Sequence, residues 1–300
     1  MRIFITGGTG FLGNHVVREL KAKGHDLLLL SRVARSRDGV RCVVGNMANV
    51  SAWEKELKVF KPEIAIHLAW EDIPKNDKET CVKNLVGGLN CLRAFGEAGC
   101  ETVLVAGSDQ EYGQTGKKKN EKSPLKPHNM LFAAKAALYL MGTQIAEQYK
   151  MNFLWARIFF VYGPGQRSKA LIPYLANSLR AGAVPEIKNP YGANDFIYID
   201  DVVRAIRMLV GRKPKSSNEI YNIGSGKLTP TAEVIREVFS FFKKPVPFFP
   251  PKAKMQVVLK GSYADIAKIK KDTGWKPKVS VKTGIIKMLS ELMKQDIPQS

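Results

Sequence analysis

The sequence predicts an α/β protein with a doubly wound parallel sheet and a smaller, mixed α/β lobe in its C-terminal part. Short apolar segments alternate with amphipathic segments through the first half of the 300 residues. This alternation is typical of a parallel sheet that helices cover on both faces. A glycine-rich turn separates the first apolar segment from the first amphipathic one, and beyond about Gly165 the alternation is lost.

The apolar segments predict the strands of the sheet, in chain order, at residues 2–6, 26–31, 40–44, 64–69, 102–106 and 153–158. Amphipathic patterns between them predict helices near residues 11–23, 51–60, 79–98 and 128–150. Crossovers between parallel strands are right-handed, so these helices should cover both faces of the sheet.

The later part of the chain is richer in proline, glycine and lysine, and its helical patterns are joined by irregular segments. Those patterns lie near residues 168–182, 201–211, 231–242 and 281–294. We therefore expect one domain over residues 1–165, which also receives the segment 195–212, and a second lobe over residues 166–300. No internal repeat is present.

The composition is that of a globular protein, with 45% hydrophobic residues and a formal net charge of +20. The basic residues are spread along the chain, with local density at 117–119 and from 243 to 287, and no nucleic-acid-binding motif accompanies them. No apolar run approaches the roughly 18 residues of a membrane span, and no signal-peptide pattern precedes the first strand. We expect a cytoplasmic protein with no nucleic-acid or membrane partner.

The chain has four cysteines, Cys42, Cys81, Cys91 and Cys100. They lack C-x-x-C spacing and paired histidines. We therefore expect reduced, mostly buried thiols and no metal site.

Gly7, Gly10 and Gly13 form a G-x-x-G-x-x-G pattern directly after the first strand and directly before the first helix. Glycine at these positions permits a tight turn, a close approach of the backbone to a pyrophosphate, and close packing of the helix on the strand. The amino end of that helix then faces the anion. This context predicts a Rossmann-type dinucleotide site.

The end of the second strand indicates which dinucleotide is bound. An acidic residue there would hold the ribose 2′-hydroxyl of NAD. Here Ser31 and Arg32 stand at that place, with Arg35 and Arg37 close behind. Because the arginine fork suits a phosphate, the sequence favours NADP(H) over NAD(H).

Further motifs follow in a fixed order: TGGTGFLG at 6–13, HLA at 67–69, Asn84, EYG at 111–113, Lys135, RIFFVYGPGQR at 157–167, DFIYIDD at 195–201, YNIGSG at 221–226 and GWKP at 274–277. Over nearly its whole length the chain resembles the extended short-chain dehydrogenase/reductases, the NAD-dependent epimerase/dehydratase family that acts on nucleotide sugars. AWEDIP at 69–74, GSDQEYG at 107–113 and Phe160 are most similar to reductases of nucleotide-linked 4-keto-6-deoxyhexoses.

The resemblance implies a set of cofactor-binding residues, with the adenine beside Asn46 and Met47 and the nicotinamide ribose near Leu68, Ala69 and Lys135. The full set is Gly7, Thr9, Gly10, Phe11, Leu12, Gly13, Ser31, Arg32, Arg35, Asn46, Met47, Leu68, Ala69, Trp70, Asn84 and Lys135. Simpler interpretations stand beside three motif residues: His67 as a hydrogen-bonded core histidine, Asp201 as the start of a helix, and Asn84 as a bridge between backbone groups.

The resemblance also implies that the second lobe binds a nucleotide-sugar substrate. The substrate-binding residues would be Ser108, Asp109, Gln110, Phe160, Arg167 and Asn194. Asn194 stands where relatives often carry an arginine that grips the substrate diphosphate, although Arg167 and nearby lysines offer replacement charges.

One residue of the family's catalytic trio is missing. The trio is a Ser or Thr after the fifth strand and a Tyr-x-x-x-Lys on the next helix. Ser108 and Lys135 match, but Leu131 stands four residues before Lys135, where the tyrosine would share its helix face. Leucine cannot exchange a proton. The rate contribution of a positioned acid, typically 10²- to 10⁴-fold, would therefore be lost.

Four residues are candidates to replace the tyrosine: Ser108, Asp109, Tyr112 and Tyr139. For the two tyrosines, packing in the core or in an interface is the competing interpretation. Asp109 stands where dehydratases of the family keep an acid, but Gln110 replaces the glutamate that follows it there. We take Ser108, Lys135 and Asp109 as the candidate catalytic residues.

The sequence thus supports an NADP(H)-dependent reductase of a nucleotide-linked 4-keto-6-deoxyhexose. The alternatives are a nucleotide-sugar epimerase or dehydratase, and a catalytically weak or silent binding protein that keeps the fold without the tyrosine. A homodimer is expected because relatives pair the helices at 79–98 and 128–150, where Leu138, Leu140 and Met141 offer apolar surface.

Overall fold

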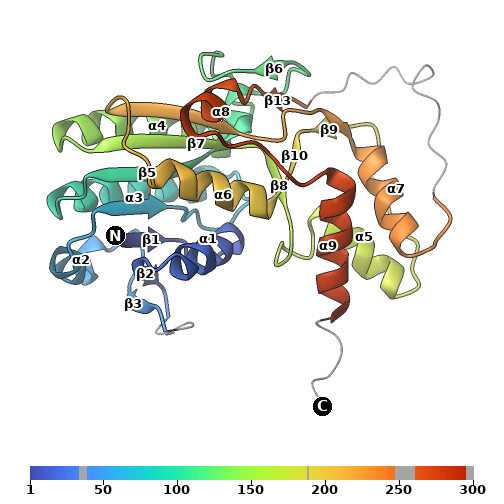
Figure 1. The fold of residues 1–300 in the computed structure, drawn as a ribbon, viewed down its shortest axis with the longest axis horizontal. Coiled ribbons are helices and arrows are strands. Elements are labelled where there is room, and N and C mark those ends of the chain that lie inside the picture. The colour runs from blue at the N-terminus through green and yellow to red at the C-terminus, as the bar shows by residue number, and fades with distance from the viewer. Residues whose placement is uncertain (34–38, 188, 247–260, 295–300) are drawn as a thin grey trace.

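The computed structural model describes residues 1–33, 39–187, 189–246 and 261–294, and its centre is one large parallel sheet (Figure 1). The sheet has seven strands in the order β11-β7-β5-β4-β1-β2-β3, and every neighbouring pair is parallel. The strands are β1 (Arg2–Thr6), β2 (Asp26–Ser31), β3 (Arg41–Val44), β4 (Ile64–His67), β5 (Thr102–Ser108), β7 (Asn152–Ile158) and β11 (Asn218–Ile223). The doubly wound fold is confirmed.

The strand order reverses beside β1, which pairs with β2 on one side and β4 on the other. At its carboxyl end Thr6 is level with Leu30 and His67. In open α/β sheets the crevice outside the carboxyl ends at such a reversal is where ligands bind. The topology therefore directs attention to the segments that follow β1, β2, β4 and β5.

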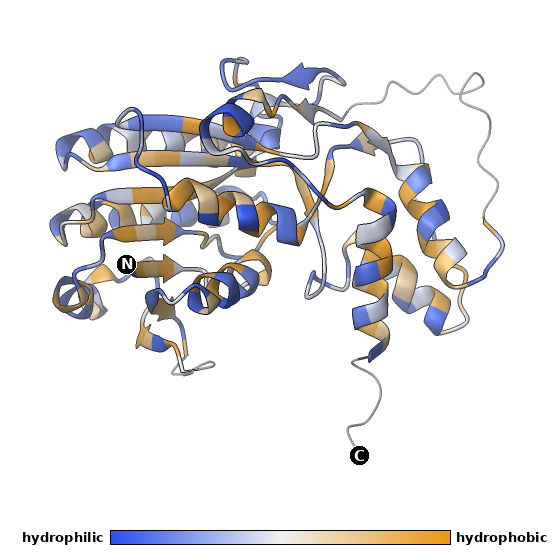
Figure 2. Cartoon of the chain, viewed as in Figure 1, coloured by the Kyte–Doolittle hydropathy of each residue, from blue (hydrophilic) through white to orange (hydrophobic). Residues whose placement is uncertain are grey.

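Helices cover both faces of the sheet, and alternate strand residues divide the core into two layers. Ile3 and Ile5 belong to a cluster with α1 (Phe11–Ala22) and α6 (Ile199–Val210). Phe4 belongs to a cluster with α2 (Glu54–Phe60), α3 (Lys78–Glu97) and α4 (Met130–Gln148). Figure 2 shows the strands as mainly hydrophobic and the helices as mixed, as this two-sided burial requires.

Helices from the second half of the chain gather at one end of the molecule (Figure 1). They are α5 (Leu171–Arg180), α7 (Thr231–Phe241) and α9 (Val281–Lys294), and their apolar faces continue the core layer that contains Ile3. Three two-stranded sheets connect this lobe to the large sheet. They pair β8 (Phe160–Tyr162) with β10 (Phe196–Tyr198), β9 (Ala193–Asn194) with β12 (Thr229–Pro230), and β6 (Lys118–Lys119) with β13 (Tyr263–Ala264).

The helices and strands expected from the sequence are confirmed to within a few residues at their ends. The structure adds β11, α8 (Ala267–Thr273) and the short strands of the two-stranded sheets. The segment 195–212 supplies α6, which packs on α1. The large sheet also receives β11 from the second half of the chain. The division near residue 165 stays a prediction.

One surface expectation is wrong. Leu138 is buried beneath α3, where the absence of a side chain at Gly88 leaves room for it. Leu140 and Met141 are exposed as expected.

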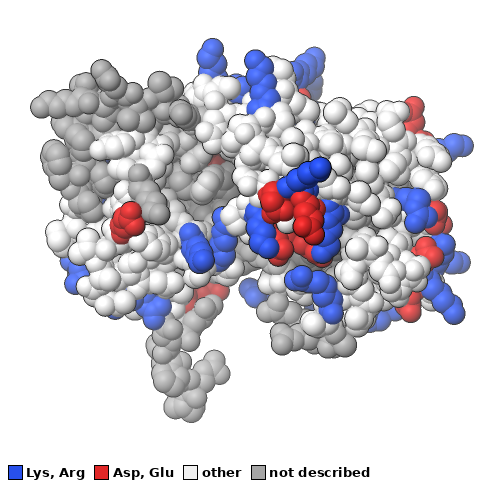
Figure 3. All heavy atoms as spheres, turned by 180° about the vertical axis from the view of Figure 1, so that it is seen from behind, with Lys and Arg blue, Asp and Glu red and all other residues white. Residues whose placement is uncertain are grey.

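Many charged residues lie on the surface, whereas the cysteines are buried or half-buried. On the face seen in Figure 3, lysine and arginine side chains are scattered, and a group of acidic side chains lies among them. Cys81, Cys91 and Cys100 are buried and Cys42 is half-buried, all as free thiols. Within the described ranges, no cluster of His, Cys, Asp or Glu could hold a metal ion, and no helix is long and apolar enough to cross a bilayer.

Two buried aspartates tie the later segments together. Asp195 accepts hydrogen bonds from the backbone N–H groups of Ser225, Gly226 and Ala264 at 2.6–2.9 Å. Asp201, in the first turn of α6, accepts three from the backbone of Lys278 and Val279 at 2.9–3.0 Å. Asp201 therefore does more than begin a helix, because it fixes the segment that leads into α9.

Asp201→Ala is expected to lower the free energy of unfolding by on the order of 3 kcal/mol, because it leaves the partly buried N–H groups of Lys278 and Val279 and the paired Arg204 without their acceptor. The exposed neighbour provides the matched control: Asp200→Ala should cost less than about 1 kcal/mol, the size of a favourable charge at a helix start. Urea unfolding of the three proteins measures both. Equal losses in the two variants would contradict this assignment.

Candidate active site

The glycine-rich turn holds the amino end of α1 against β1 and β4. Gly7 has a φ of +72°, and a Cβ there would lie 2.6 Å from the backbone nitrogen of Ala69. A Cβ on Gly13 would collide with the carbonyl oxygen of Gly7. The α1 helix begins after Gly10 with no capping side chain and no acid in its first turn. Its first N–H groups therefore favour an anion at this point.

A cavity of about 200 Å³ opens beside this turn. It brings together ten of the predicted cofactor residues: Gly7, Thr9, Gly10, Ser31, Arg32, Asn46, Met47, Leu68, Ala69 and Trp70. Phe11, Leu12, Gly13, Asn84 and Lys135 do not line it, and Arg35 lies outside the described residues, as does Arg37. The close backbone approach at Gly7 and the uncapped helix start fit the pyrophosphate of a dinucleotide.

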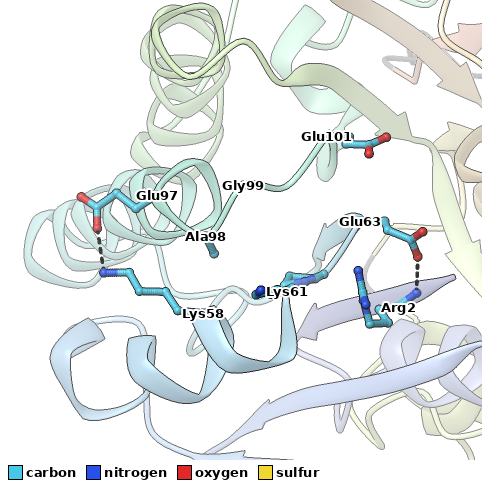
Figure 4. Close-up of a pocket in the computed structure, with 9 residues that line it drawn as sticks. Arg2, Lys58, Lys61, Glu63, Glu97, Ala98, Gly99 and Glu101 are labelled. Carbon is cyan, nitrogen blue, oxygen red and sulfur yellow. Dashed lines mark hydrogen bonds and ion pairs between the residues drawn. The ribbon is translucent and has the colours of Figure 1, made fainter.

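A larger hollow of about 290 Å³ lies elsewhere (Figure 4). Its lining residues Arg2, Glu63 and Glu101 stand at the amino ends of β1, β4 and β5. Two carboxylates there already have partners, since Glu63 accepts from the Arg2 backbone at 2.6 Å and Glu97 lies 3.7 Å from Lys58 Nζ. Ligands of open α/β sheets bind at the opposite edge, so this hollow is not the candidate site.

The loops after β2 and β3 shape the far end of the cavity. Ser31 is buried and accepts a hydrogen bond from the Val33 backbone at 3.3 Å, while Arg32 is exposed on the rim. Asn46 accepts from the backbone of Ala48 and Asn49 at 2.9 and 3.0 Å. Its side-chain oxygen therefore holds its own loop in shape.

His67 and Asn84 form hydrogen bonds at the end of β4 and in the segment that follows it. His67 Nδ1 lies 2.7 Å from the hydroxyl of Thr6, its Nε2 has no partner among the described residues, and burial lowers its pKa to about 3. Asn84 exchanges hydrogen bonds with the backbone of Glu71 at 2.6 and 3.2 Å and donates to Thr80. The backbone-bridging interpretation of Asn84 accounts for these contacts; its role toward a cofactor stays a prediction.

Lys135 and Leu131 lie on one face of α4. Lys135 is buried, its Nζ donates to the carbonyl of Ala106 at 3.0 Å and stands 4.5 Å from the centre of the Trp70 ring. Burial lowers the pKa of Lys135 to about 8. Leu131 is 4% exposed and packs in a small apolar cluster with Cys81, Ala134 and Trp70. The space around position 131 is thus filled by hydrocarbon.

Ser108 ends β5 and starts a single 3-10 turn, η2 (Asp109–Tyr112). Its hydroxyl accepts from the Gln110 backbone at 3.2 Å and lies 3.4 Å from Asp109 Oδ1. The Asp109 carboxyl is buried and accepts from Gln110 Nε2 at 2.6 Å. Three of the predicted substrate residues therefore share one turn at the carboxyl edge of the sheet.

Glu111, on the same turn, is the supporting residue that the sequence reasoning missed. It is fully buried and accepts from the Ser108 backbone at 2.7 Å, from Trp155 at 3.0 Å and from Arg157 at 2.8 Å. The available signal was Arg157, a charge inside the apolar strand β7, because a buried arginine needs an acidic partner.

The two tyrosine candidates are structural. Tyr112 is fully buried, donates to Asn222 at 2.8 Å and accepts from Arg157 at 2.9 Å. Tyr139 packs with its ring 5.4 Å from that of Trp155, on the core side of α4. Ser108 and Asp109 remain as the hydroxyl and carboxyl groups of the candidate set.

The remaining substrate residues lie on the segments that lead to the second lobe. Phe160 is 39% exposed and packs on Phe196, and its backbone N–H donates to Asp195 O at 3.0 Å, next to Asn194. Arg167 is exposed in the loop before α5. The structure therefore places the Phe160 backbone one residue from Asn194 in β9, while Arg167 lies in a separate loop.

Known proteins resemble this chain over most of its length. Residues 3–224 match the sequence model described as the NAD dependent epimerase/dehydratase family. A probable UDP-glucuronate 4-epimerase of Rhizobium meliloti is 28% identical over 73% of this chain and 71% of its own length. A dTDP-4-dehydro-6-deoxyglucose reductase of Escherichia coli is 24% identical over 97% of both chains.

Solved structures of epimerases have the same fold as this chain. A Thermus thermophilus UDP-glucose 4-epimerase in complex with NAD has 25% identity and a TM-score of 0.84 over 98% of this chain and 99% of its own. A UDP-glucose 4-epimerase of Thermotoga maritima, at 22% identity, has a TM-score of 0.86 over 98% of this chain and 99% of its own, and shares the fold.

Proposed function

The chain belongs to the NAD dependent epimerase/dehydratase family, and from this premise we propose that it reduces a nucleotide-linked 4-keto-6-deoxyhexose at C4. The observation that carries the proposal is the turn after β5, where Ser108 and Asp109 lie at the same edge of the sheet as the glycine turn and beside the helix of Lys135. The similarity to a reductase of this substrate class over 97% of both chains supports it.

A nicotinamide dinucleotide would supply the hydride, and this chain's residues would hold it. The backbone at Gly7 and Gly10 with the start of α1 would bind the pyrophosphate. Asn46 and Met47 would flank the adenine, and Leu68, Ala69 and Lys135 would lie along the nicotinamide ribose. Phe160, Arg167 and Asn194 would face the sugar nucleotide.

The charges at the rim of the cavity favour NADP(H). Glu71 and Asp72 also line it, but they pair with Lys83 at 2.9 Å and Lys75 at 3.1 Å. Among the described residues, Arg32 has no ion-pair partner. It therefore remains free to bind a 2′-phosphate.

NADPH should bind more tightly than NADH, and Arg32→Asp should reverse the order. A hydrogen bond to a charged group contributes about 1.5–3 kcal/mol, so each change should be roughly 10- to 100-fold in Kd. Calorimetry with both cofactors measures it, and Lys55→Asp, the same charge change at an exposed residue of α2, is the control. Tighter NADH binding by the unaltered protein would overturn the cofactor proposal.

In the proposed reaction Ser108 donates a hydrogen bond to the carbonyl oxygen and Lys135 orients the ribose. Leu131 supplies no proton, so we expect slow turnover. Leu131 already packs against Trp70 and Cys81, and a phenol added there would overpack the cluster. Restoring the tyrosine therefore requires space at Trp70.

The double variant Trp70→Ala/Leu131→Tyr is expected to turn over about 10²-fold faster than Trp70→Ala alone, because the new phenol provides an acid near Lys135. Ser108→Ala should remove most of the rate of the unaltered protein, since it deletes a donor to the developing alkoxide. Single-turnover oxidation of NADPH with a panel of 4-keto sugar nucleotides measures these rates. A double variant that turns over no faster than Trp70→Ala alone would mean that a different residue already serves as the acid.

Epimerisation is the second candidate, favoured by the similarity to 4-epimerases. An epimerase returns the hydride to the same substrate, so the sugar would interconvert with no net oxidation of NADPH. Dehydration is disfavoured because Gln110 cannot protonate a leaving hydroxyl. If no sugar nucleotide reacts while cofactor still binds, the chain is a silent binding protein, as the buried Leu131 would explain.

A homodimer is proposed through α3 and α4, which pack side by side and share an exposed apolar face. Leu140 is 57% exposed and Met141 51% on α4, with Val82 and Val86 on α3. Such a face is typical of a four-helix dimer interface.

Light scattering at micromolar concentration should give twice the 33.3 kDa chain mass, and Leu140→Asp/Met141→Asp should give the single mass because two charges cannot be buried unpaired. Val59→Asp, at an exposed site on α2, should leave the dimer intact. A single chain mass for the unaltered protein would contradict the proposal.

A further inference from the structure

Asp109 is a buried carboxyl beside the one hydroxyl left in the candidate active site. The side chain is 6% exposed and directly follows Ser108 at the end of β5. Its Oδ1 lies 3.4 Å from Ser108 Oγ, and its Oδ2 accepts from Gln110 Nε2 at 2.6 Å. The carboxyl therefore contacts the hydroxyl that the proposed reaction uses.

The surroundings of this carboxyl, as far as the structure describes them, lack a paired cation. In the part of the chain that the structure describes, no lysine or arginine forms an ion pair with Asp109. The charged groups that face it are acidic: Asp195, which precedes β10, and Glu111 on the same turn. The charge of Arg157 is directed at Glu111, 2.8 Å away.

These surroundings favour the protonated acid. Burial raises the pKa of Asp109 to about 7, and the negative charges of Asp195 and Glu111 act in the same direction, while hydrogen bonds from Gln110 and Ser108 oppose the change. An ordinary aspartate would be ionised at neutral pH. Asp109 instead retains its proton in a large fraction of molecules there.

We propose that Asp109 supplies the proton that the absent phenol would supply, and that it does so through the hydroxyl of Ser108. The inference rests on the proposed reduction at C4 and names the acid for it. Ser108 contacts the substrate oxygen, and Asp109 replenishes the proton that Ser108 gives up.

The relay balances. The carbonyl carbon at C4 accepts a hydride from the reduced nicotinamide dinucleotide, forming a C–H bond, and the π electrons of the C=O bond move to the oxygen. That oxygen takes the hydroxyl proton of Ser108, whose Oγ takes the carboxyl proton of Asp109. Asp109 is left as a carboxylate and regains a proton from solvent. The sugar is reduced by two electrons and the dinucleotide is oxidised by two.

The other titratable side chains nearby form hydrogen bonds with groups other than the Ser108 hydroxyl. Lys135 directs its Nζ at the carbonyl of Ala106 and the ring of Trp70. Glu111 accepts from Ser108 N, Trp155 and Arg157, and Tyr112 is bonded to Asn222 and Arg157. Among the titratable side chains that the structure describes, only the Asp109 carboxyl is hydrogen-bonded to Ser108 Oγ.

A double-mutant cycle tests the relay. Asp109→Asn keeps the shape and removes the acid, and it should lower the single-turnover rate of NADPH oxidation by roughly 10²-fold or more. Ser108→Ala should cost about as much, and the double variant no more than the larger single loss, because groups that act as a unit are not additive. Asp200→Asn, the same change at an exposed site, should leave the rate unchanged.

The proton itself gives a readout that does not require turnover. Since the folded pKa of Asp109 is raised above that of the unfolded chain, the folded state binds the extra proton between about pH 4 and pH 7, and stability falls as pH rises through that window. Asp109→Asn removes this fall. Its midpoint of thermal unfolding, relative to the unaltered protein, should therefore be higher at pH 8 than at pH 4, and Asp200→Asn should show no such change.

The outcomes separate the relay from the reaction. If the unaltered protein turns over and Asp109→Asn is equally fast, the relay is overturned and the reductase stands. Multiplicative losses in the double variant would mean that Ser108 and Asp109 act independently, which also overturns it. If no variant reacts while NADPH binding persists, the proposed function fails and the relay fails with it. If the difference in unfolding midpoint between Asp109→Asn and the unaltered protein is the same at pH 4 and pH 8, Asp109 is not protonated at neutral pH and the relay is overturned.

Discussion

The buried pair of Glu111 and Arg157 fixes the turn on which the candidate chemistry depends. The carboxylate sits beneath the end of β5 and joins the Ser108 backbone to two side chains of β7. Removing two charges from water is costly, and the cost is offset only where hydrogen bonds satisfy the remaining lone pairs and protons. Here they do, because Trp155 and Tyr112 complete the network. The direction in which Ser108 and Asp109 point follows from this contact.

The topology then brings the other parts to the same edge. The strand order reverses beside β1, and the start of α1, the segment after β4 and the turn after β5 all lie at the carboxyl edge of the sheet. Trp70 links the segment after β4 to α4, since it lines the cavity and lies against both Lys135 and the cluster of Leu131. The apolar cluster of Leu131 therefore adjoins the cavity through Trp70.

Much of this could be predicted from the sequence because it depends on local patterns. A few consecutive residues are enough to predict the apolar strands β1, β2 and β5. The same is true of the glycine turn. The strand β11, NEIYNI, was missed because its alternation of polar and apolar residues is short and stands in an irregular region. Glu111, the Asn84 bridge and the burial of Asp109 could not be predicted either. Each depends on which segments meet in space, not on the residues beside it in the chain.

The place of β11 also has a consequence for how the chain folds during synthesis. β7 pairs with β5 on one side and with β11 on the other, yet about sixty residues separate β7 from β11 and include α5 and α6. Until those residues leave the ribosome, the apolar strand NFLWARI has one unpaired edge, and such an edge invites pairing with another chain. Arg157 lies in β7, and its charge would oppose pairing with another chain until β11 has been synthesised.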